Sequence, residues 1–256
     1  MMRITIKIGS NVLTRKDGSL DVTRMSALVD QVADLRAQGH EIILVSSGAV
    51  ASGRSELKHI VHDLDSVDQR QLFSAVGQAK LMNRYFEMFR EYGIAVGQVL
   101  TTKENFLDNE HRKNQENCLR VMLENGVLPI VNENDTVSIT ELMFTDNDEL
   151  SGLIAQMTDS HLLIILSNID GLFTGNPADP HSELVRTVTP GQDVSGYIRL
   201  DKSSAGRGGM QSKSSVAARA AEAGIGVLIA NGKRENILLC LLSDRSATPC
   251  TEFLVR

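Results

Sequence analysis

Residues 127–135 read VLPIVNEND, an apolar run that ends in four polar residues. A short, continuously apolar run is typical of a strand buried within a parallel sheet. Asn132-Glu133-Asn134-Asp135 therefore lies at the carboxyl end of the predicted strand, and Asp146-Asn147-Asp148 follows eleven residues later. Ligands of open α/β sheets bind at this edge. These side chains are suited to hold a cation, an ammonium group or a metal-bound phosphate.

Strand and helix patterns alternate through most of the chain. Ile4, Ile6 and Ile8 alternate with polar residues, which is the period-2 pattern of a strand. The alternation predicts an α/β fold, a three-layer αβα sandwich with a mainly parallel central sheet. Further strands are expected at residues 41–45, 94–100, 127–131, 161–166 and 225–230, with a last edge strand at 252–255. Helices are expected at residues 21–38, 67–92, 109–125 and 213–223, and after Asp146.

Composition agrees with a globular α/β protein. The 256 residues suffice for one sizeable domain or two small ones, and 42% of them are hydrophobic. Only 4% are aromatic and none is Trp, so the core must be mostly aliphatic, as in a buried parallel sheet. The net charge of −6 argues against general binding to nucleic acid or to anionic membranes.

The same sequence predicts a cytoplasmic protein. Its three cysteines have no metal-ligand spacing, which indicates a reducing compartment. The first nine residues carry charge and alternate, unlike a signal peptide, and no apolar run approaches the ~20 residues of a membrane span. His59 and His62 are three apart, but no carboxylate cluster completes a site around them. No protein ligands for a metal are therefore predicted.

Two small-residue turns follow predicted strands. Lys7-Ile8-Gly9-Ser10 ends the first strand, where the glycine lets the backbone approach a ligand and the lysine can reach a phosphate. Ser46-Ser47-Gly48-Ala49-Val50 follows the second strand and opens a predicted helix whose backbone N–H groups could hold an anion. Taken singly, the first could be an ordinary turn with a solvated lysine, and the second a serine helix cap.

Residues 205–213, AGRGGMQSK, form the clearest phosphate-type loop. Its glycines precede Lys213, which begins a predicted helix. The loop is not a Walker A motif, because Ser212 stands where a glycine should precede the lysine. It is not a G-x-G-x-x-G turn after a strand either, which disfavours a Rossmann dinucleotide fold. A plain flexible surface loop is the alternative interpretation.

Together these motifs indicate phosphoryl transfer. Two lysines, Lys7 and Lys213, stand at distant element ends, while an acid–amide cluster occupies residues 132–148. Phosphoryl transfer needs charge neutralisation and positioning more than covalent chemistry. No Ser-His-Asp or Cys-His arrangement competes with this interpretation.

At these residues the chain resembles the amino acid kinase family, and within it the branch whose members phosphorylate glutamate. The resemblance runs from Lys7 to about Gly232. The N-E-N-D and D-N-D pair is its most specific part. The matching motifs are KIGS at 7–10, SSGAV at 46–50, AVGQ at 75–78, PIVNENDTV at 129–137, DND at 146–148 and GGMxxK at 208–213.

The resemblance implies transfer of the ATP γ-phosphate to the side-chain carboxylate of L-glutamate, giving the acyl phosphate used in proline biosynthesis. Magnesium would be coordinated by the ATP phosphates, with few protein ligands. The lysines would stabilise the moving phosphoryl group, and Asp148 would hold them. Catalysis is thus assigned to Lys7, Lys213 and Asp148. Glutamate binding is assigned to Ser47, Gly48, Asn132, Asp135 and Asn147, with Asp135 and Asn147 on its ammonium group. Nucleotide binding is assigned to Gly9, Ser167, Asn168, Gly171, Gly206, Gly208, Gly209 and Met210.

The resemblance also carries expectations about the whole chain. It implies one amino acid kinase domain over residues 1–256, with a substrate lobe to about 165 and a nucleotide lobe beyond. A C-terminal PUA domain, common in this branch, is expected to be absent. A homo-oligomer and feedback inhibition by proline are expected, without nucleic-acid or membrane partners. The chain departs from the family in having Asn168 for the usual aspartate of the nucleotide loop and Arg207 for the usual threonine.

Two other functions remain open from the sequence. One is an amino acid kinase for another substrate, such as acetylglutamate, aspartate or carbamate. An N-acylated substrate would leave Asp135 unpaired, at a cost of roughly 1–3 kcal/mol. The other is a non-catalytic sensor of glutamate or proline with the same fold. The presence of both lysines disfavours a sensor, whereas Asn168 and Arg207 keep it under consideration.

Overall fold

The computed structural model describes residues 1–58, 64–138, 144, 146–197 and 209–256. Within these residues a single sheet has the strand order β3-β4-β2-β1-β5-β7-β8-β6. All neighbours pair in parallel except β7 and β8. The strands are β1 Arg3–Ile8, β2 Glu41–Val45, β3 Val96–Thr101, β4 Leu128–Glu133, β5 Leu162–Ser167, β6 Thr187–Val188, β7 Gly226–Asn231 and β8 Cys250–Phe253.

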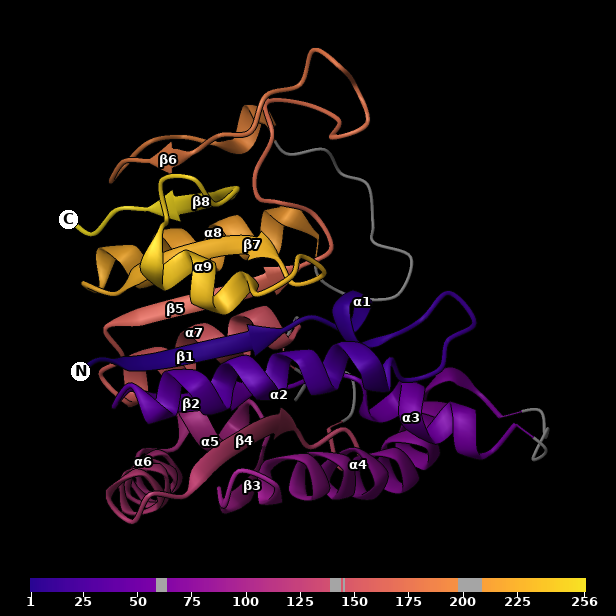
Figure 1. Cartoon of the computed structure of the whole chain (residues 1–256). Coiled ribbons are helices and arrows are strands. Elements are labelled where there is room, and N and C mark those ends of the chain that lie inside the picture. Colours follow the sequence, from indigo (N-terminus) through magenta and orange to yellow (C-terminus); the bar gives the residue numbers. More distant parts are fainter. Residues whose placement is uncertain (59–63, 139–143, 145, 198–208) are drawn as a thin grey trace.

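Helices cover both faces of this sheet (Figure 1). In that view α2 and α9 lie in front of the sheet, while α7 and α8 lie behind it. The three-layer αβα fold with a mainly parallel sheet is therefore confirmed. The helices are α1 Ser10–Leu13, α2 Val22–Ala37, α3 Ala49–Glu56, α4 Ser66–Arg90, α5 Glu104–Leu107, α6 Asn109–Glu124, α7 Asn147–Met157, α8 Met210–Glu222 and α9 Ile237–Ser243, with a 3-10 turn at Ser195–Tyr197.

The alternation of β1 assigns its residues to two different layers. Ile4, Ile6 and Ile8 are buried in the core that contains the apolar faces of α2, α4 and α9. Thr5 and Lys7 point to the opposite face, because successive side chains of a strand alternate. The separate apolar clusters on that opposite face involve α6, α7 and α8. Lys7 is thus a buried charge, which requires a partner.

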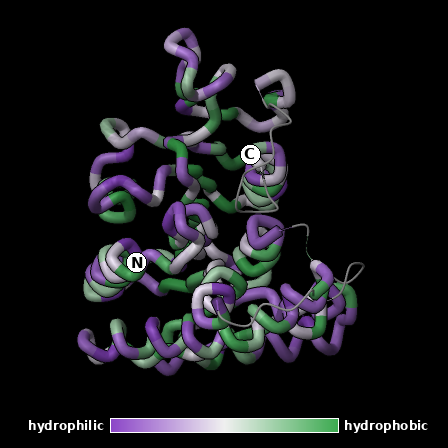
Figure 2. Tube along the Cα trace, turned by 90° about the vertical axis from the view of Figure 1, so that its right-hand side faces the viewer, coloured by the Kyte–Doolittle hydropathy of each residue, from purple (hydrophilic) through white to green (hydrophobic). Residues whose placement is uncertain are grey.

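Amphipathic helices explain the layers. Along the trace in Figure 2 the helices mix hydrophilic and hydrophobic segments, as expected for helices with one buried face. The α2 helix begins as predicted, since the Asp21 side chain accepts a hydrogen bond from the Arg24 backbone N–H at 3.1 Å. No helix of the described residues is long and apolar enough to cross a bilayer.

One strand differs from expectation. The segment predicted as a last edge strand over 252–255 is β8, Cys250–Phe253, and it pairs on both sides. It lies antiparallel to β7 and parallel to β6, so the two-residue strand β6 occupies the edge. A two-residue strand carries no readable alternation, which is why the sequence pattern left β8 at the edge.

Candidate active site

One large cavity, about 1340 Å³, opens at the carboxyl ends of β1, β2, β4 and β5. This is the position where parallel sheets bind ligands. Its lining combines backbone turns after the strands with the first turns of α7 and α8. It includes these sequence-predicted residues: Lys7, Gly9, Ser47, Gly48, Asn132, Asp135, Asn147, Asp148, Ser167, Asn168, Gly171, Gly209, Met210 and Lys213. The other two predicted residues, Gly206 and Gly208, lie outside the described residues, as do His59 and His62.

Two lysines share one carboxylate in this cavity. Lys7 Nζ lies 2.5 Å from Asp148 Oδ1, and Lys213 Nζ lies 2.8 Å from Asp148 Oδ2. All three side chains are buried, with Asp148 only 1% exposed. The three groups come from β1, α7 and α8, elements far apart in the sequence. The cluster carries a net charge of +1 when all three groups are ionised, so it is prepared to receive an anion.

Burial and mutual attraction set the charges of this cluster. Burial lowers the pKa of the Lys7 ammonium below its ordinary value, and the nearby Lys213 ammonium lowers it too, while Asp148 opposes both. Burial alone would raise the pKa of the Asp148 carboxyl. The charges of Lys7 and Lys213 outweigh it and hold that pKa below the ordinary value. The ionised triad is therefore held together by its own electrostatics.

Asp146 positions the α7 terminus that carries Asp148. Its Oδ1 accepts hydrogen bonds from the backbone N–H groups of Asp148 and Glu149 at 2.9 and 3.0 Å. This is an N-cap, and the positive end of the helix dipole also favours the Asp148 carboxylate. Motif reading left Asp146 without a role. An aspartate directly before a helix is nevertheless a signal that could have identified it.

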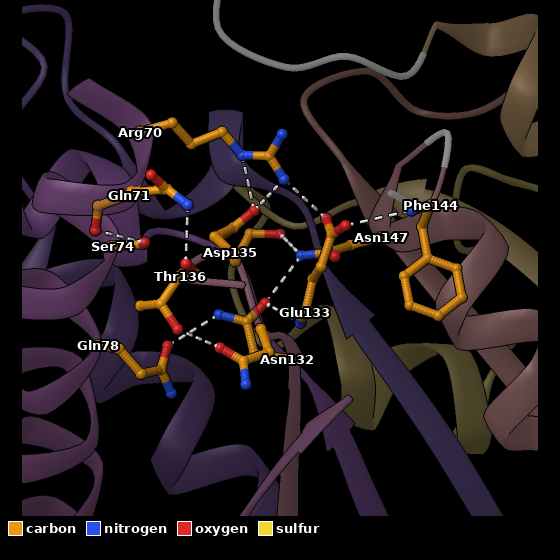
Figure 3. Close-up of polar contacts among 12 residues, drawn as sticks. Arg70, Gln71, Ser74, Gln78, Asn132, Glu133, Asp135, Thr136, Phe144 and Asn147 are labelled. Carbon is orange, nitrogen blue, oxygen red and sulfur yellow. Dashed lines mark hydrogen bonds and ion pairs between the residues drawn. The ribbon is translucent and has the colours of Figure 1, made fainter. Parts of the chain in front are cut away.

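An amide network forms a second part of the site (Figure 3). Asn147 Nδ2 donates to the Ser46 carbonyl at 2.9 Å, to Ser47 Oγ at 3.1 Å and to Asn132 Oδ1 at 3.1 Å. Asn132 Nδ2 donates in turn to Gln78 Oε1 at 2.9 Å. The network ties the turn after β2 to the end of β4 and to α4. Three predicted glutamate-binding residues are thereby brought together.

Two features fix the conformation of the turn that carries Ser47. Gly48 has a φ of +101°, a left-handed conformation that residues with side chains rarely adopt, and it is the N-cap of α3. The preceding residue, Ser46, shares a 2.8 Å hydrogen bond with the buried Tyr85 hydroxyl. Burial raises the pKa of Tyr85 to about 12, so the phenol stays protonated. The turn is therefore fixed by backbone conformation and by a buried hydrogen bond.

A third part of the site is acidic, and it contains an arginine that the sequence did not reveal. Arg70, in the first turns of α4, places Nε 2.8 Å from Asp135 Oδ1, and its Nη2 also pairs with that oxygen. The same Nη2 lies 3.4 Å from Glu133 Oε2. Figure 3 shows the Arg70 guanidinium reaching both carboxylates. Asp135, predicted to hold an ammonium group, here faces a guanidinium.

Metal-ligand chemistry is weak in the described part of this cavity. No cluster of three His, Cys, Asp or Glu side chains that could hold a metal occurs among the described residues. The buried ammonium groups of Lys7 and Lys213 also disfavour a second cation beside them. The described part of the cavity thus has acidic and basic side chains but no grouped set of three such metal ligands.

Comparison with known proteins gives a consistent result. The amino acid kinase family matches residues 2–231. Glutamate 5-kinase of Bacteroides thetaiotaomicron is 67% identical over 252 residues, 98% of this chain and 70% of the relative. Glutamate 5-kinase of Chlorobaculum tepidum is 46% identical over 92% of this chain and 65% of its own length. That of Symbiobacterium thermophilum is 41% identical, over 94% of this chain and 92% of its own.

Solved structures show the same fold at low sequence identity. Carbamate kinase from Giardia lamblia, bound to AMP-PNP, matches with a TM-score of 0.69 at 14% identity, over 100% of this chain and 99% of its own. UMP kinase from Ureaplasma parvum matches with a TM-score of 0.65 at 17% identity, over 99% and 98%. Because the identities are so low, these likenesses establish the fold alone.

Proposed function

The chain belongs to the amino acid kinase family, and we propose that it transfers the γ-phosphoryl group of ATP to the side-chain carboxylate of L-glutamate. The product is L-glutamyl 5-phosphate, so the reaction is the first step of proline biosynthesis. The observation that carries the chemistry is the pair of buried lysines on one buried carboxylate. The names of relatives up to 67% identical support glutamate as the acceptor.

Charge is the main obstacle to this reaction. A glutamate carboxylate is already ionised at neutral pH, so it needs no general base before it attacks phosphorus. It must, however, approach an anionic γ-phosphate. Lys7 and Lys213 neutralise that repulsion and stabilise the charge on the oxygens of the transferring phosphoryl group. In a buried site such charges act more strongly than in water.

Asp148 acts as a positioning residue in this scheme. It binds both lysine ammonium groups, which keeps their side chains in place and still leaves the cluster a net charge of +1. The new bond joins a glutamate oxygen to the γ-phosphorus, and the bond to the β-phosphate oxygen breaks. ADP leaves with the electron pair. Magnesium enters as part of the magnesium–ATP substrate.

The remaining predicted residues divide between the two substrates. Glutamate is held by five residues: Ser47, Gly48 through its backbone, Asn132, Asp135 and Asn147. A free ammonium group needs acceptors, which the acid–amide part of the cavity supplies. The second group lines the other part of the cavity and holds ATP: Gly9, Ser167, Asn168, Gly171, Gly209 and Met210. Gly206 and Gly208 are proposed to complete the nucleotide loop.

A product-trapping assay tests the function. The protein is incubated with magnesium–ATP and L-glutamate in the presence of hydroxylamine, which converts the acyl phosphate to a coloured hydroxamate. We expect product with L-glutamate and little with N-acetylglutamate or aspartate, since the ammonium and the chain length are both recognised. Product with another acceptor but none with glutamate would refute the substrate. Absence of turnover with every acceptor, together with glutamate binding, would indicate a sensor.

A further inference from the structure

The acidic part of the cavity holds a cation that the glutamate assignment does not explain. Arg70 projects from α4 and contacts Asp135 and Glu133, and all three line the cavity. Its side chain is 18% exposed, so the guanidinium is largely removed from water yet open to a ligand. The planar guanidinium of arginine suits the recognition of a carboxylate, because it can donate two parallel hydrogen bonds to it.

Glutamate presents three charges, and the lysine cluster accounts for only one. The reacting side-chain carboxylate goes to the lysines, and the ammonium goes to carboxylate and amide oxygens. The α-carboxylate needs a cation of its own, because an unpaired charge in a desolvated site is expensive. We propose that Arg70 binds the α-carboxylate of the amino acid substrate. The inference rests on the proposed function and deepens it.

The contacts of Arg70 indicate how the ion pair between Arg70 and Asp135 is replaced by ion pairs to the substrate. In the structure the guanidinium neutralises Asp135, the group expected to take the substrate ammonium. A zwitterionic amino acid brings a cation for Asp135 and an anion for Arg70 at adjacent atoms. The Arg70–Asp135 ion pair is replaced by two ion pairs, Arg70 with the α-carboxylate and Asp135 with the ammonium group, so no charge is left unpaired. Glu133, whose Oε1 accepts the Phe144 backbone N–H at 3.1 Å, keeps the guanidinium near the exchange.

Anchoring the α-carboxylate also determines which carboxylate reacts. Glutamate has two carboxylates, and both are attracted to Lys7 and Lys213. A guanidinium in the acidic part of the site retains the α-carboxylate, so the side-chain carboxylate is directed to the lysines. Specificity then comes from a fixed orientation as well as from affinity.

Arg54 is the other cation to consider at this end. It also lines the cavity. Its guanidinium carbon lies 5.6 Å from the centre of the Phe73 ring, a cation–π contact, and the residue is exposed. Its contact is with the Phe73 ring, so it does not take part in the charge exchange described for Arg70. Its substitution serves as a discriminating control.

The test compares Arg70→Gln, Arg70→Lys and Arg54→Gln with the wild type. The KM for L-glutamate is measured by hydroxamate formation. Two analogues are measured as competitive inhibitors, which detects weak ligands: 4-aminobutyrate, which lacks the α-carboxylate, and glutarate, which lacks the ammonium. Arg70→Gln should raise the glutamate KM and the glutarate Ki by about 10- to 100-fold, the loss of a charge-assisted hydrogen bond. The Ki of 4-aminobutyrate should change by less than roughly 3-fold.

Each other outcome has a definite meaning. Arg70→Lys should recover part of the loss, because it keeps the charge without the planar fork. If 4-aminobutyrate weakens as much as glutamate, Arg70 only orders Asp135 and the inference is wrong. It is equally wrong if Arg54→Gln, rather than Arg70→Gln, shows the selective loss. Failure of the proposed function would look different, because the wild type itself would then form no glutamyl hydroxamate.

Discussion

Asp148 makes sense as a residue for chemistry rather than for stability. Replacing a buried ion pair by apolar residues of similar volume is often neutral or stabilising, so a buried triad is weak evidence of a stabilising role. Breaking such a cluster by removing one partner is another matter, because an uncompensated charge remains inside. Asp148 is the partner of two buried ammonium groups, Lys7 and Lys213. Its removal would leave both buried ammonium groups without this carboxylate as a counter-ion.

Asp148→Asn should therefore lower the free energy of unfolding at pH 7 by about 3–5 kcal/mol. The pKa of Asp148 is depressed in the folded protein, so its contribution is fully present above the ordinary aspartate pKa. It is lost as the pH falls through the folded-state pKa, where the carboxylate takes up a proton. Urea unfolding at a series of pH values measures the difference in free energy of unfolding between wild type and variant. That difference should become smaller only at pH values below the ordinary aspartate pKa.

Asp34→Asn is the matched control for that series. Asp34 is exposed on α2, away from the cavity, so its change should stay within about ±0.5 kcal/mol at every pH. An Asp148→Asn gap that is independent of pH down to strong acid would show that the carboxylate's charge is not the source of the effect.

Lys213→Ala should lower kcat by about 10²–10³, a far larger effect than the accompanying rise in the KM for glutamate. Lys213 acts on charge that develops during transfer, so its removal weakens the transition state more than the bound substrates. Steady-state kinetics with glutamate and ATP varied in turn provide the measurement. An unchanged kcat with a raised KM for ATP would make Lys213 a ground-state phosphate anchor instead.

Arg70 shows the limit of residue-level prediction from sequence. Lys7, Asp148 and Lys213 stand in motifs next to strand ends or glycines, and these features indicated a common site. Arg70 lies within a long helical pattern, where a basic residue ordinarily faces solvent. Its partner Asp135 is 65 positions away in the chain. Only the packing of α4 against the end of β4 reveals the pair.

At the scale of elements, the site depends on two helices that approach very closely. A Cβ on Gly53 of α3 would lie 1.8 Å from the Phe73 carbonyl oxygen of α4. A Cβ on Gly77 of α4 would lie 1.8 Å from the Ala49 carbonyl oxygen of α3. No side chain fits at either point. The AVGQ motif at 75–78 thus combines a helix crossing with Gln78, which holds Asn132.

Gly77→Ala should push α3 and α4 apart. The added methyl meets backbone, which cannot move aside like a flexible side chain, so we expect destabilisation of about 1–3 kcal/mol despite alanine's better helix propensity. Because Gly48, assigned to glutamate binding, is the N-cap of α3, the glutamate KM should also rise. Denaturant unfolding and kinetics measure both effects. Asn83→Ala, on an exposed face of α4, should change stability by no more than about ±0.5 kcal/mol; an equal loss there would rule out the crossing as the cause.

The elements that could be predicted are those with a long or repeated pattern. The expected helix at 67–92 corresponds to α4, Ser66–Arg90, and the expected strand at 127–131 corresponds to β4, Leu128–Glu133. The α9 helix, Ile237–Ser243, was missed because ILLCLLS is apolar on most sides and too short to show a period. Its burial against α2 is a tertiary effect that no local pattern announces.

At the scale of the whole molecule, the residues proposed to bind the two substrates are distributed across the strands of the sheet. The acid–amide residues follow β2 and β4, on one side of β1. Of the described residues assigned to the nucleotide, Gly9 follows β1 itself, and the others lie at or after the end of β5, or at the start of α8, on the other side. Lys7 on β1 and Asp148 on α7 lie where these groups meet. The two-lobe division at about residue 165 remains a prediction, since the strands form one continuous sheet.

This distribution predicts that Asp135→Asn separates the two substrates in a thermal-shift experiment. A ligand at 100 times its Kd stabilises the folded state by about 2.7 kcal/mol, which raises the Tm of a chain this size by roughly 5–10 °C. Removing the Asp135 charge should weaken glutamate binding about 10- to 100-fold, leaving a shift of a few degrees or less at the same concentration.

The shift produced by magnesium–ATP should be the same for Asp135→Asn and the wild type, each compared with its own ligand-free Tm. In the proposed function the phosphates lie beside Lys7 and Lys213, which pair with Asp148, whereas Asp135 pairs with Arg70. The variant keeps the shape of the side chain, so a selective loss of the glutamate shift reports the charge alone. If both shifts fell together, Asp135 would be organising the whole cavity, and its assignment to the substrate ammonium would have to be withdrawn.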